Sequence, residues 1–473
     1  MRTASLCLLV PVCLLTFELS APAQEDLAQL LKSAQDPDPQ ERAKAVRAIA
    51  KIQTPEAAQV LVRLLADPHD YVHDEAIQGL TTFSNEEVFR FLHERALPGT
   101  RDLRTLAGIA AVIAELGLKP AVPNLVKALS VAREDAAVQV LRALARLADP
   151  LAKEAVAGKL RSPEWKTKTA ALEAYAALAG EEAVEPVVAA LSDPDFRARV
   201  AALQALAKVK PDRALEHART LVADAHWSVQ VAAIRVIERA RDQASIPILV
   251  EQLRKEKGRL RKDLADALRT IASSQNDGEA ADQSVVTYYG IQIYSKRVLF
   301  VTDLSQGMKE KAKGSSQSRI AIAQEEYINC LKGYPEDGYF NLVVFATEVA
   351  PWSPHLQRGV PVAKGQSADW LAKMVQSWIF ARDTGRTNIY DALAACFDDP
   401  DVDTIVLLTD ATTITEGTFR TKEDVLRRLG ELNRYRNIQF HTIGIGKHEE
   451  TKAARSLIKE LAESTRGTFL ETD

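Results

Sequence analysis

The chain has 473 residues, of which 47% are hydrophobic and 26% charged, and its formal net charge at pH 7 is −4. These values exclude a disordered, low-complexity or collagen-like protein, and the lack of a basic excess argues against a nucleic-acid partner. Such a length corresponds to about three average domains, but the patterns along the chain divide it differently.

The segment 1–23 has the pattern of a secretory signal peptide. Arg2 supplies a positive charge, an apolar stretch covers 6–17, and the string APA at 21–23 fits the small-x-small rule for cleavage. The apolar stretch is too short to span a bilayer comfortably; an uncleaved anchor and a lipidated Cys13 are the alternatives. The sequence therefore predicts an exported protein (periplasmic, cell-surface or secreted) whose mature chain has no transmembrane segment.

Removal of this leader leaves two cysteines, Cys330 and Cys396. Each lies in an apolar stretch with helical spacing, so the sequence predicts two buried thiols that pack as small hydrophobic side chains. A disulfide between them is the alternative in an oxidising compartment, although two cysteines do not make a disulfide framework.

From residue 24 to residue 273 the chain repeats itself with a period near 31. Asp36 and Asp67 each begin an Asp-Pro string, and the strings that begin at Asp193 and Asp224 are separated by the same interval as this first pair. Amphipathic helix patterns lie before and after each string. Proline suits the first turn of a helix because its missing N–H would be unpaired there, and the aspartate before it can cap the open amides.

Neither helix of such a unit can bury its apolar face alone. Successive units are therefore expected to stack into an all-α solenoid of about eight repeats. The pattern resembles the HEAT-repeat family in its short bacterial form, similar to phycobilin-lyase repeats. This resemblance implies an extended surface that binds other proteins.

Two features of the repeated region stand out from this pattern. Trp165 and Trp227 follow inter-helix turns, and we expect them to pack against the neighbouring repeat, with an exposed contact face as the alternative. The string RKEKGRLRK at 254–262 concentrates positive charge. We expect it to solvate the end of the solenoid, and docking of an acidic partner is the alternative.

Residues 274–290 are mostly small, polar and acidic and break the periodicity, which predicts a linker. From 291 to 473, apolar runs of strand length alternate with amphipathic helices. The strand-length runs are 298–303, 339–347, 404–410 and 438–446. The helices are expected at 318–334, 367–380, 388–397, 422–435 and 453–464. This alternation predicts an α/β domain with a mainly parallel, doubly wound (Rossmann-like) sheet covered on both faces.

The acidic residues between 398 and 403 alternate loosely, like those of a calcium-binding loop. No glycine and glutamate follow at the spacing of an EF-hand. The sequence therefore predicts a solvated turn here.

Polar residues stand at the ends of the predicted strands, where open parallel sheets bind ligands. Asp303 and Ser305 close the first strand, Asp410 ends the third, and Thr387 precedes a helix. Three loops thus bring carboxylate and hydroxyl oxygens to one edge of the sheet. An all-oxygen site of this kind suits a hard divalent cation such as Mg²⁺ rather than zinc.

In these residues and in the order of its elements, the segment 291–473 resembles the von Willebrand factor type A family. The metal-ion-dependent adhesion site of that family uses an Asp-x-Ser-x-Ser string, a distant Thr and a distant Asp, and the four residues above match it one by one. Gly307 stands where the second Ser is expected, so Gln306 or a water is the candidate substitute ligand. The resemblance implies that Ser305 and Thr387 touch Mg²⁺ (or Mn²⁺) and that the two aspartates act partly through water. It also implies that a Glu or Asp of a partner protein completes the metal shell.

Together these features predict an exported, non-enzymatic protein of two domains that mediates protein–protein interaction or adhesion through a metal-bridged contact. No P-loop string is present in the sequence, which disfavours an ATPase. A metal-independent scaffold with a vestigial site is one alternative. A non-catalytic accessory subunit of a chelatase-like complex is another.

Overall fold

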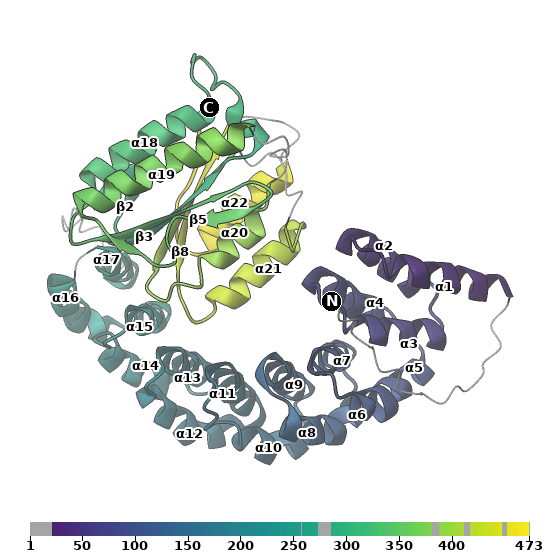
Figure 1. Ribbon diagram of the computed structural model, residues 1–473. Coiled ribbons are helices and arrows are strands. Elements are labelled where there is room, and N and C mark those ends of the chain that lie inside the picture. The colour runs from purple at the N-terminus through teal and green to yellow at the C-terminus, as the bar shows by residue number, and fades with distance from the viewer. Residues whose placement is uncertain are drawn as a thin grey trace, which may run out of the picture. The chain divides into compact units, whose positions relative to one another are not determined.

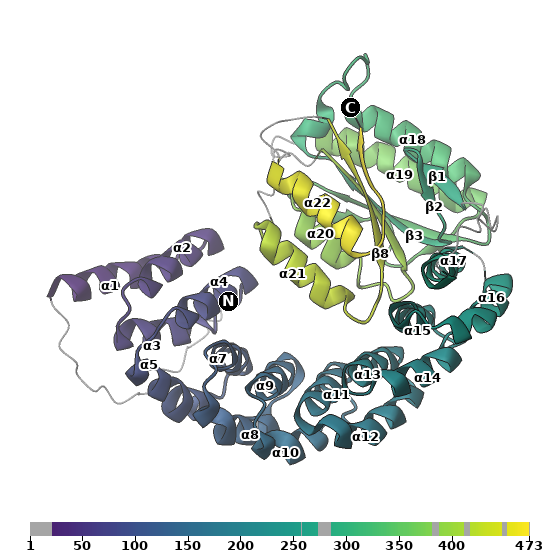
Figure 2. The same cartoon turned by 180° about the vertical axis from the view of Figure 1, so that it is seen from behind.

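The computed structural model describes residues 21–256, 258–272, 285–380, 387–410, 417–446 and 452–472. The chain forms two compact units, Met1–Ala128 and Leu129–Asp473. The first is helical, and the second joins further helices to an α/β domain (Figure 1 and Figure 2). The division therefore falls inside the repeated region and not at its end.

The first unit consists of helices joined by tight turns. Its elements are α1 (Ala21–Ser33), α2 (Pro39–Ala50), α3 (Pro55–Leu64), α4 (Asp70–Thr81), α5 (Glu86–Arg90), η1 (Phe91–Ala96), α6 (Leu97–Gly99), α7 (Leu103–Glu115) and η2 (Lys119–Ala121), and α8 (Val122–Val131) runs across the boundary. Asp38 caps α2 by accepting a hydrogen bond from Gln40 N at 2.8 Å, and Pro39 occupies the first turn. The capping residue is thus the third of the string, as His69, Asp195 and His226 are at the later strings, and Pro37, Pro68 and Pro194 lie before the helices and not in their first turns. The strings mark the turns as predicted, but the predicted places of the cap and of the recurring proline are wrong.

Charged contacts between successive turns explain why the strings recur. Arg42 donates to the carboxylate of Asp67 in the following turn at 2.7 and 2.9 Å, and to the carbonyl oxygen of Asp36 in its own turn at 3.0 Å. In the second unit, Arg199 makes the equivalent contacts with Asp224 at 2.9 and 2.7 Å. The regular period thus preserves a charge-assisted link between repeats as well as the turn itself.

The helical part of the second unit continues the repeats. Its elements are α9 (Glu134–Leu147), η3 (Pro150–Ala152), α10 (Lys153–Ala157), α11 (Trp165–Ala179), η4 (Gly180–Ala183), α12 (Val184–Ala189), η5 (Ala190–Ser192), α13 (Phe196–Val209), α14 (Pro211–Leu221), α15 (Trp227–Ala240), η6 (Gln243–Ser245), α16 (Ile246–Lys255) and α17 (Arg259–Ala272). Arg197 lies over the ring of Trp165 at 4.0 Å, and Arg259 lies over the ring of Trp227 at 5.2 Å. Both tryptophans therefore pack against the next repeat, which confirms that prediction.

The α/β domain has a mostly parallel sheet. Its elements are β1 (Val286–Tyr288), β2 (Ile291–Ile293), β3 (Arg297–Asp303), η7 (Gln306–Lys309), α18 (Arg319–Gly333), β4 (Tyr339–Phe345), β5 (Val349–Pro351), β6 (Gln357–Arg358), α19 (Pro361–Phe380), α20 (Ile389–Ala395), β7 (Thr404–Thr409), α21 (Lys422–Asn433), β8 (Gln439–Ile445), α22 (Lys452–Ser464) and β9 (Phe469–Thr472). The strand order is β5-β4-β3-β7-β8-β9, and β6 also pairs with β4.

The layers of this domain follow the predicted doubly wound arrangement. Strands β4, β3, β7, β8 and β9 are parallel, whereas β5 and β6 run antiparallel to β4. Helices α18 and α19 cover one face of the sheet, and α20, α21 and α22 cover the other (Figure 1). Four central strands are buried along nearly their whole length, because a parallel sheet has helices on both faces.

Strand β1 and the turn to β2 occupy residues 286–290, which the sequence pattern assigned to the linker. The strand is too short to show an alternation of polar and apolar positions. Residues 274–284 of the predicted linker lie outside the described residues, as do residues 1–20 of the predicted leader, and α1 begins at Ala21.

Two predictions about charged segments hold only in part, because each segment has exposed residues and one buried residue with a specific role. The acidic turn at 398–403 is not simply solvated, because the buried carboxylate of Asp399 accepts hydrogen bonds from Leu356 N at 2.6 Å and Asp401 N at 2.9 Å. The basic string at 254–262 does not only solvate the end of the solenoid, since Arg259 is 5% exposed. Burial of a guanidinium requires acceptors, and those of Arg259 lie in the α/β domain.

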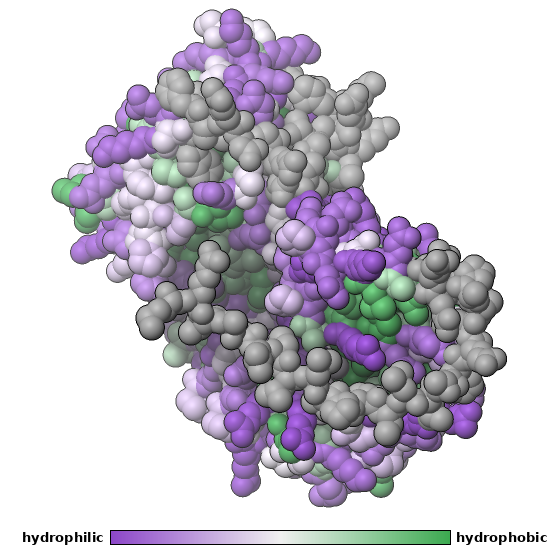
Figure 3. Space-filling model, turned by 45° about the vertical axis from the view of Figure 1, so that its right-hand side comes forward, coloured by the Kyte–Doolittle hydropathy of each residue, from purple (hydrophilic) through white to green (hydrophobic). Residues whose placement is uncertain are grey.

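Cys330 and Cys396 are both buried and both free thiols, as predicted, and burial raises the pKa of Cys330 to about 12. No helix among the described residues combines the length and the apolar character needed to cross a membrane. On the face shown in Figure 3, hydrophilic residues cover much of the described surface, and hydrophobic residues show mainly in its recesses.

Candidate metal site

Three of the four predicted ligand residues lie at the carboxyl ends of two neighbouring strands, and the fourth lies in a loop before a helix. Asp303 is the last residue of β3, and Asp410 directly follows β7. These strands are adjacent and parallel, with Thr302 opposite Leu408, so both carboxylates reach the same edge. Ser305 follows β3, and Thr387 precedes α20. All four residues are at most 2% exposed.

Asp303 is held by two hydrogen bonds. Its Oδ1 accepts from Ser305 N at 2.7 Å, and its Oδ2 accepts from the hydroxyl of Thr409 at 2.5 Å. Burial, together with the charge of Asp410, raises the pKa of Asp303. Two carboxylates in a buried place repel each other, so the ionised pair is costly unless a positive charge joins it.

The hydroxyl of Ser305 also indicates that a cation would be stabilised at this edge. Its Oγ is buried and makes no hydrogen bond to another described residue. A buried polar atom normally has a partner, and a cation bound between the carboxylates would supply one. The described residues contain no cluster of three or more His, Cys, Asp or Glu side chains suited to a metal. The four predicted residues offer two carboxylates and two hydroxyls, a donor set that would fit Mg²⁺ or Mn²⁺.

The loop that carries Thr387 is fixed by its neighbour Asn388. The backbone N of Asn388 donates to Ala346 O at 2.9 Å, and its side-chain amide donates to Thr347 O at 3.3 Å and to Asp391 at 2.9 Å. Asn388 also caps α20 by accepting from Asp391 N at 3.2 Å. Because Ala346 directly follows β4, these bonds tie the Thr387 loop to the same edge of the sheet.

A second loop closes on Asn388. Gly417 has a φ of +99°, and a Cβ built on it would lie 2.1 Å from the side-chain oxygen of Asn388. Thr418 N donates to the Asp391 carboxylate at 3.1 Å. Only glycine has room for this approach and tolerates this backbone conformation.

Gly307, which stands where the motif has its second serine, makes a backbone contact instead. Gly307 lies in η7, and its carbonyl oxygen accepts from Arg319 Nη1 at 3.0 Å. Arg319 is 6% exposed, and a Cβ on Gly446 would lie 2.4 Å from its guanidinium. Gln306 is exposed, in contrast to the four buried residues. Its role as a substitute ligand stays a prediction.

The sequence also matches known families in two parts. The HEAT-repeat family matches residues 25–112 and 154–226, and the von Willebrand factor type A domain family matches residues 296–470. The chain therefore consists of HEAT repeats followed by a von Willebrand factor type A domain.

Curated relatives match only a small part of the chain. Inter-alpha-trypsin inhibitor heavy chain H3 of Mus musculus is 30% identical over 104 residues, and that of Homo sapiens is 26% identical over 104 residues. Each match covers 22% of this chain, and the chain spans only 10% of the length of each relative.

Solved structures share parts of the architecture at low identity. A von Willebrand factor type A protein from Catenulispora acidiphila has 16% identity and a TM-score of 0.27, with 37% of this chain and 42% of that chain covered. The complex of CpcE and CpcF of phycocyanin lyase from Nostoc sp. PCC7120 has 16% identity and a TM-score of 0.28, with coverage of 55% and 99%.

Several positioning residues of the type A domain were not predicted. Asn388 and Asp391 form an N-x-x-D capping pattern that the sequence does display, so this signal was available. Thr409 directly precedes Asp410, but nothing in the sequence indicates that its hydroxyl binds Asp303. The contact of Arg319 with Gly307 joins a helix to the turn before it, and no local pattern marks it.

Proposed function

We propose that this chain is an extracytoplasmic protein that binds another protein at the metal edge of its type A domain. One observation carries the proposal: the buried Asp303 and Asp410 end neighbouring strands at the carboxyl edge of the sheet, where the buried Ser305 Oγ has no hydrogen-bond partner among the described residues. The buried Thr387 lies in a loop that is bonded to the same edge. HEAT repeats and type A domains both generally mediate contacts between proteins, which agrees with this function.

Asp303, Ser305, Thr387 and Asp410 are the residues proposed to hold Mg²⁺. When bound, the cation would supply a positive centre to which a carboxylate of the partner can attach. The protein residues orient the donors: Thr409 and Ser305 N fix the Asp303 carboxylate, and Asn388 fixes the Thr387 loop. Export of the protein is supported by the leader pattern of the segment 1–23.

The proposal is tested by calorimetric titration of Mg²⁺ into the protein and into Asp303→Asn. The substitution keeps the shape of the side chain and removes its charge, so we expect Mg²⁺ binding to be lost while the fold persists. Asp398→Asn, on an exposed carboxylate of the same domain, is the matched control and should bind like the parent. Equal binding by the parent and Asp303→Asn would contradict the assignment.

Partner capture from the native envelope, with and without EDTA, tests the second step. Capture that EDTA abolishes supports a metal-bridged contact. The metal-independent scaffold is favoured by one observation, the glycine at 307 in place of a hydroxyl residue, and it predicts the same captured proteins in both conditions.

A further inference from the structure

One row of side chains on the HEAT repeats of the second unit contacts the type A domain. The row consists of equivalent repeat positions on α9, α11, α13 and α15, namely Arg142, Glu173, Gln204 and Arg235. All four contact the segment 431–437, which ends α21 and leads into β8. Equivalent positions of successive repeats lie side by side along a solenoid, so the row forms a continuous strip.

Successive residues of the strip contact successive residues of the segment 431–437. Arg142 lies 3.7 Å from the carboxylate of Glu431. Glu173 pairs with Arg434 and accepts from the hydroxyl of Tyr435 at 2.8 Å. Gln204 donates to Arg434 O at 3.4 Å, and Arg235 donates to the side-chain oxygen of Asn437 at 2.5 Å. The first two positions of the strip therefore make ion pairs with the segment, and the last two make hydrogen bonds.

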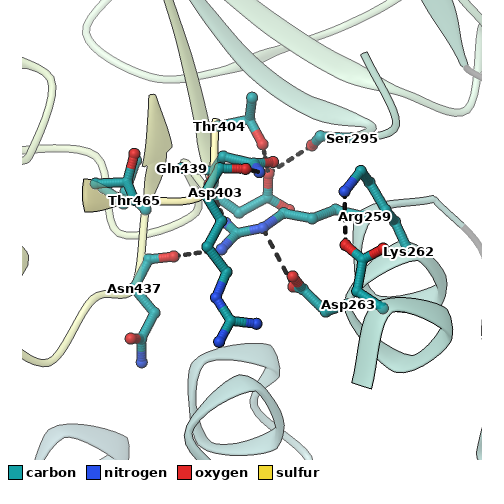
Figure 4. A network of polar contacts seen from close by, with 12 residues as sticks. Arg259, Lys262, Asp263, Ser295, Asp403, Thr404, Asn437, Gln439 and Thr465 are labelled. Carbon is teal, nitrogen blue, oxygen red and sulfur yellow. Dashed lines mark hydrogen bonds and ion pairs between the residues drawn. The ribbon is translucent and has the colours of Figure 1, made fainter. Parts of the chain in front are cut away.

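The strip ends at a buried polar network centred on Arg259 (Figure 4). Arg259 donates to Asn437 O at 2.5 Å and to Asp403 O, and its Nε lies 3.6 Å from the Asp263 carboxylate. Ser228, at the same repeat position as Arg259 but one repeat earlier, donates to Tyr435 O at 2.6 Å. The acceptors of these hydrogen bonds are backbone carbonyl oxygens of the loops that precede β7 and β8. The bonds therefore hold both loops in one conformation.

Asn437 is shaped for this contact. Its φ of 53° lies in the left-handed region, which asparagine tolerates better than most residues. In this conformation its side-chain amide donates to Ser228 O at 3.1 Å, and the residue is 5% exposed.

The network contacts the edge of the sheet at the amino ends of β7 and β8, opposite the edge that carries the proposed metal ligands. Asp403 immediately precedes β7 and Asn437 lies two residues before β8, whereas Asp303 and Asp410 stand at the carboxyl ends of β3 and β7. A strand of six or seven residues is about 20 Å long. The HEAT repeats of this unit therefore hold the domain at one end of its strands and leave the metal edge at the other.

We propose that this face of the HEAT repeats is a docking surface for the chain's own type A domain. The face is thereby withheld from other proteins, and residues 129–272 and the type A domain form one rigid body. This inference does not depend on metal binding at the opposite edge.

The test uses a protease site inserted between residues 274 and 283 of the full chain, followed by cleavage. We expect the two pieces to stay together through size-exclusion chromatography. Glu173→Arg places like charges opposite Arg434 and should weaken the association of the pieces by at least about tenfold. The swapped pair Glu173→Arg/Arg434→Glu should restore most of it.

Glu181→Arg is the matched control, because Glu181 pairs with Lys210 within the repeats. It should leave the association unchanged. Circular dichroism of each intact variant establishes that its helices are formed. Separation of the pieces of the parent protein after cleavage would overturn the proposal, as would equal effects of Glu173→Arg and Glu181→Arg.

Discussion

Arg259 offers the sharpest test of how the second unit is held together. Replacement by Met keeps a long unbranched side chain and removes the guanidinium, whose carbon lies 5.2 Å from the centre of the Trp227 ring. The carbonyl oxygens of Asp403 and Asn437 then lose their charged donor, and Asp263, which is 6% exposed, loses its nearby positive charge.

The size of the effect follows from these contacts. A hydrogen bond from a charged donor contributes about 1.5–3 kcal/mol, and breaking a buried ion pair costs about 3–5 kcal/mol. The variant no longer carries the cost of burying a charged guanidinium, and this offsets part of the lost stability. The separate contributions are not additive because the groups form one network. We therefore expect Arg259→Met to lower the free energy of unfolding of the second unit by about 3 kcal/mol.

Urea denaturation followed by tryptophan fluorescence and far-UV circular dichroism measures this change. Arg254→Met is the matched control, because Arg254 belongs to the same basic string but is exposed; it should alter stability by less than about 0.5 kcal/mol. Arg259→Met/Asp263→Leu should recover part of the loss, because it removes the carboxylate left without its partner. If Arg259→Met were as stable as Arg254→Met, the network would not hold the domain.

Two further predictions concern the type A domain. Burial, with Arg259 and Lys262 nearby, lowers the pKa of His441 to about 4, and its Nδ1 accepts from Thr468 N at 3.1 Å. The unfolded chain takes up this proton near pH 6.5, so the stabilisation is complete above about pH 6.5 and is lost towards pH 4, by on the order of 2–3 kcal/mol. Urea titrations across this range should show the loss, with a smaller pH dependence in His441→Gln; identical curves would refute it. Gly417→Ala should destabilise the domain by about 2–3 kcal/mol and weaken Mg²⁺ binding, because its Cβ would collide with Asn388. Gly430→Ala, with open space around it in α21, should instead gain about 0.5–1 kcal/mol, and equal thermal shifts for the two variants would contradict the steric argument.

The fold was predictable because its signals are local and repeated. The Asp-Pro strings mark each turn, although the residue that caps the helix is the third of the string. The apolar runs of the α/β domain are long enough to show burial on both faces. β1 and β9 were not predicted, since strands of three and four residues carry no clear alternation. Their formation depends on pairing with β2 and β8.

The positions of the proposed ligand residues at the edge of the sheet were predictable for a related reason. A residue at the carboxyl end of a parallel strand reaches a known edge whatever the rest of the chain does, so Asp303 and Asp410 could be placed from strand positions alone. The bond from Thr409 to Asp303 joins residues far apart in the sequence, and it depends on the side-chain conformations at the ends of two neighbouring strands. No local pattern specifies such a contact.

The role of Arg259 lay furthest from what sequence reasoning could reach. A string of lysines and arginines is usually solvated, and Arg254 and Lys255 of this one are exposed. Arg259 differs because it starts α17, at the repeat position that Ser228 occupies on α15, and so it points along the strip that the repeat period builds. The period was visible in the sequence, but the segment 431–437 that fits the strip has no repeat of its own.

The two edges of the sheet differ chemically in a way that separates their roles. At the amino edge, the carbonyl oxygens of Asp403 and Asn437 are satisfied within the chain by Arg259, so an outside ligand would have to replace charge-assisted hydrogen bonds that are already made. At the carboxyl edge, Ser305 Oγ has no hydrogen-bond partner among the described residues and the pKa of Asp303 is raised by burial and by Asp410. A cation there would gain contacts and relieve repulsion without breaking any hydrogen bond of Ser305 Oγ. This asymmetry is why we assign docking to the first edge and partner recognition to the second.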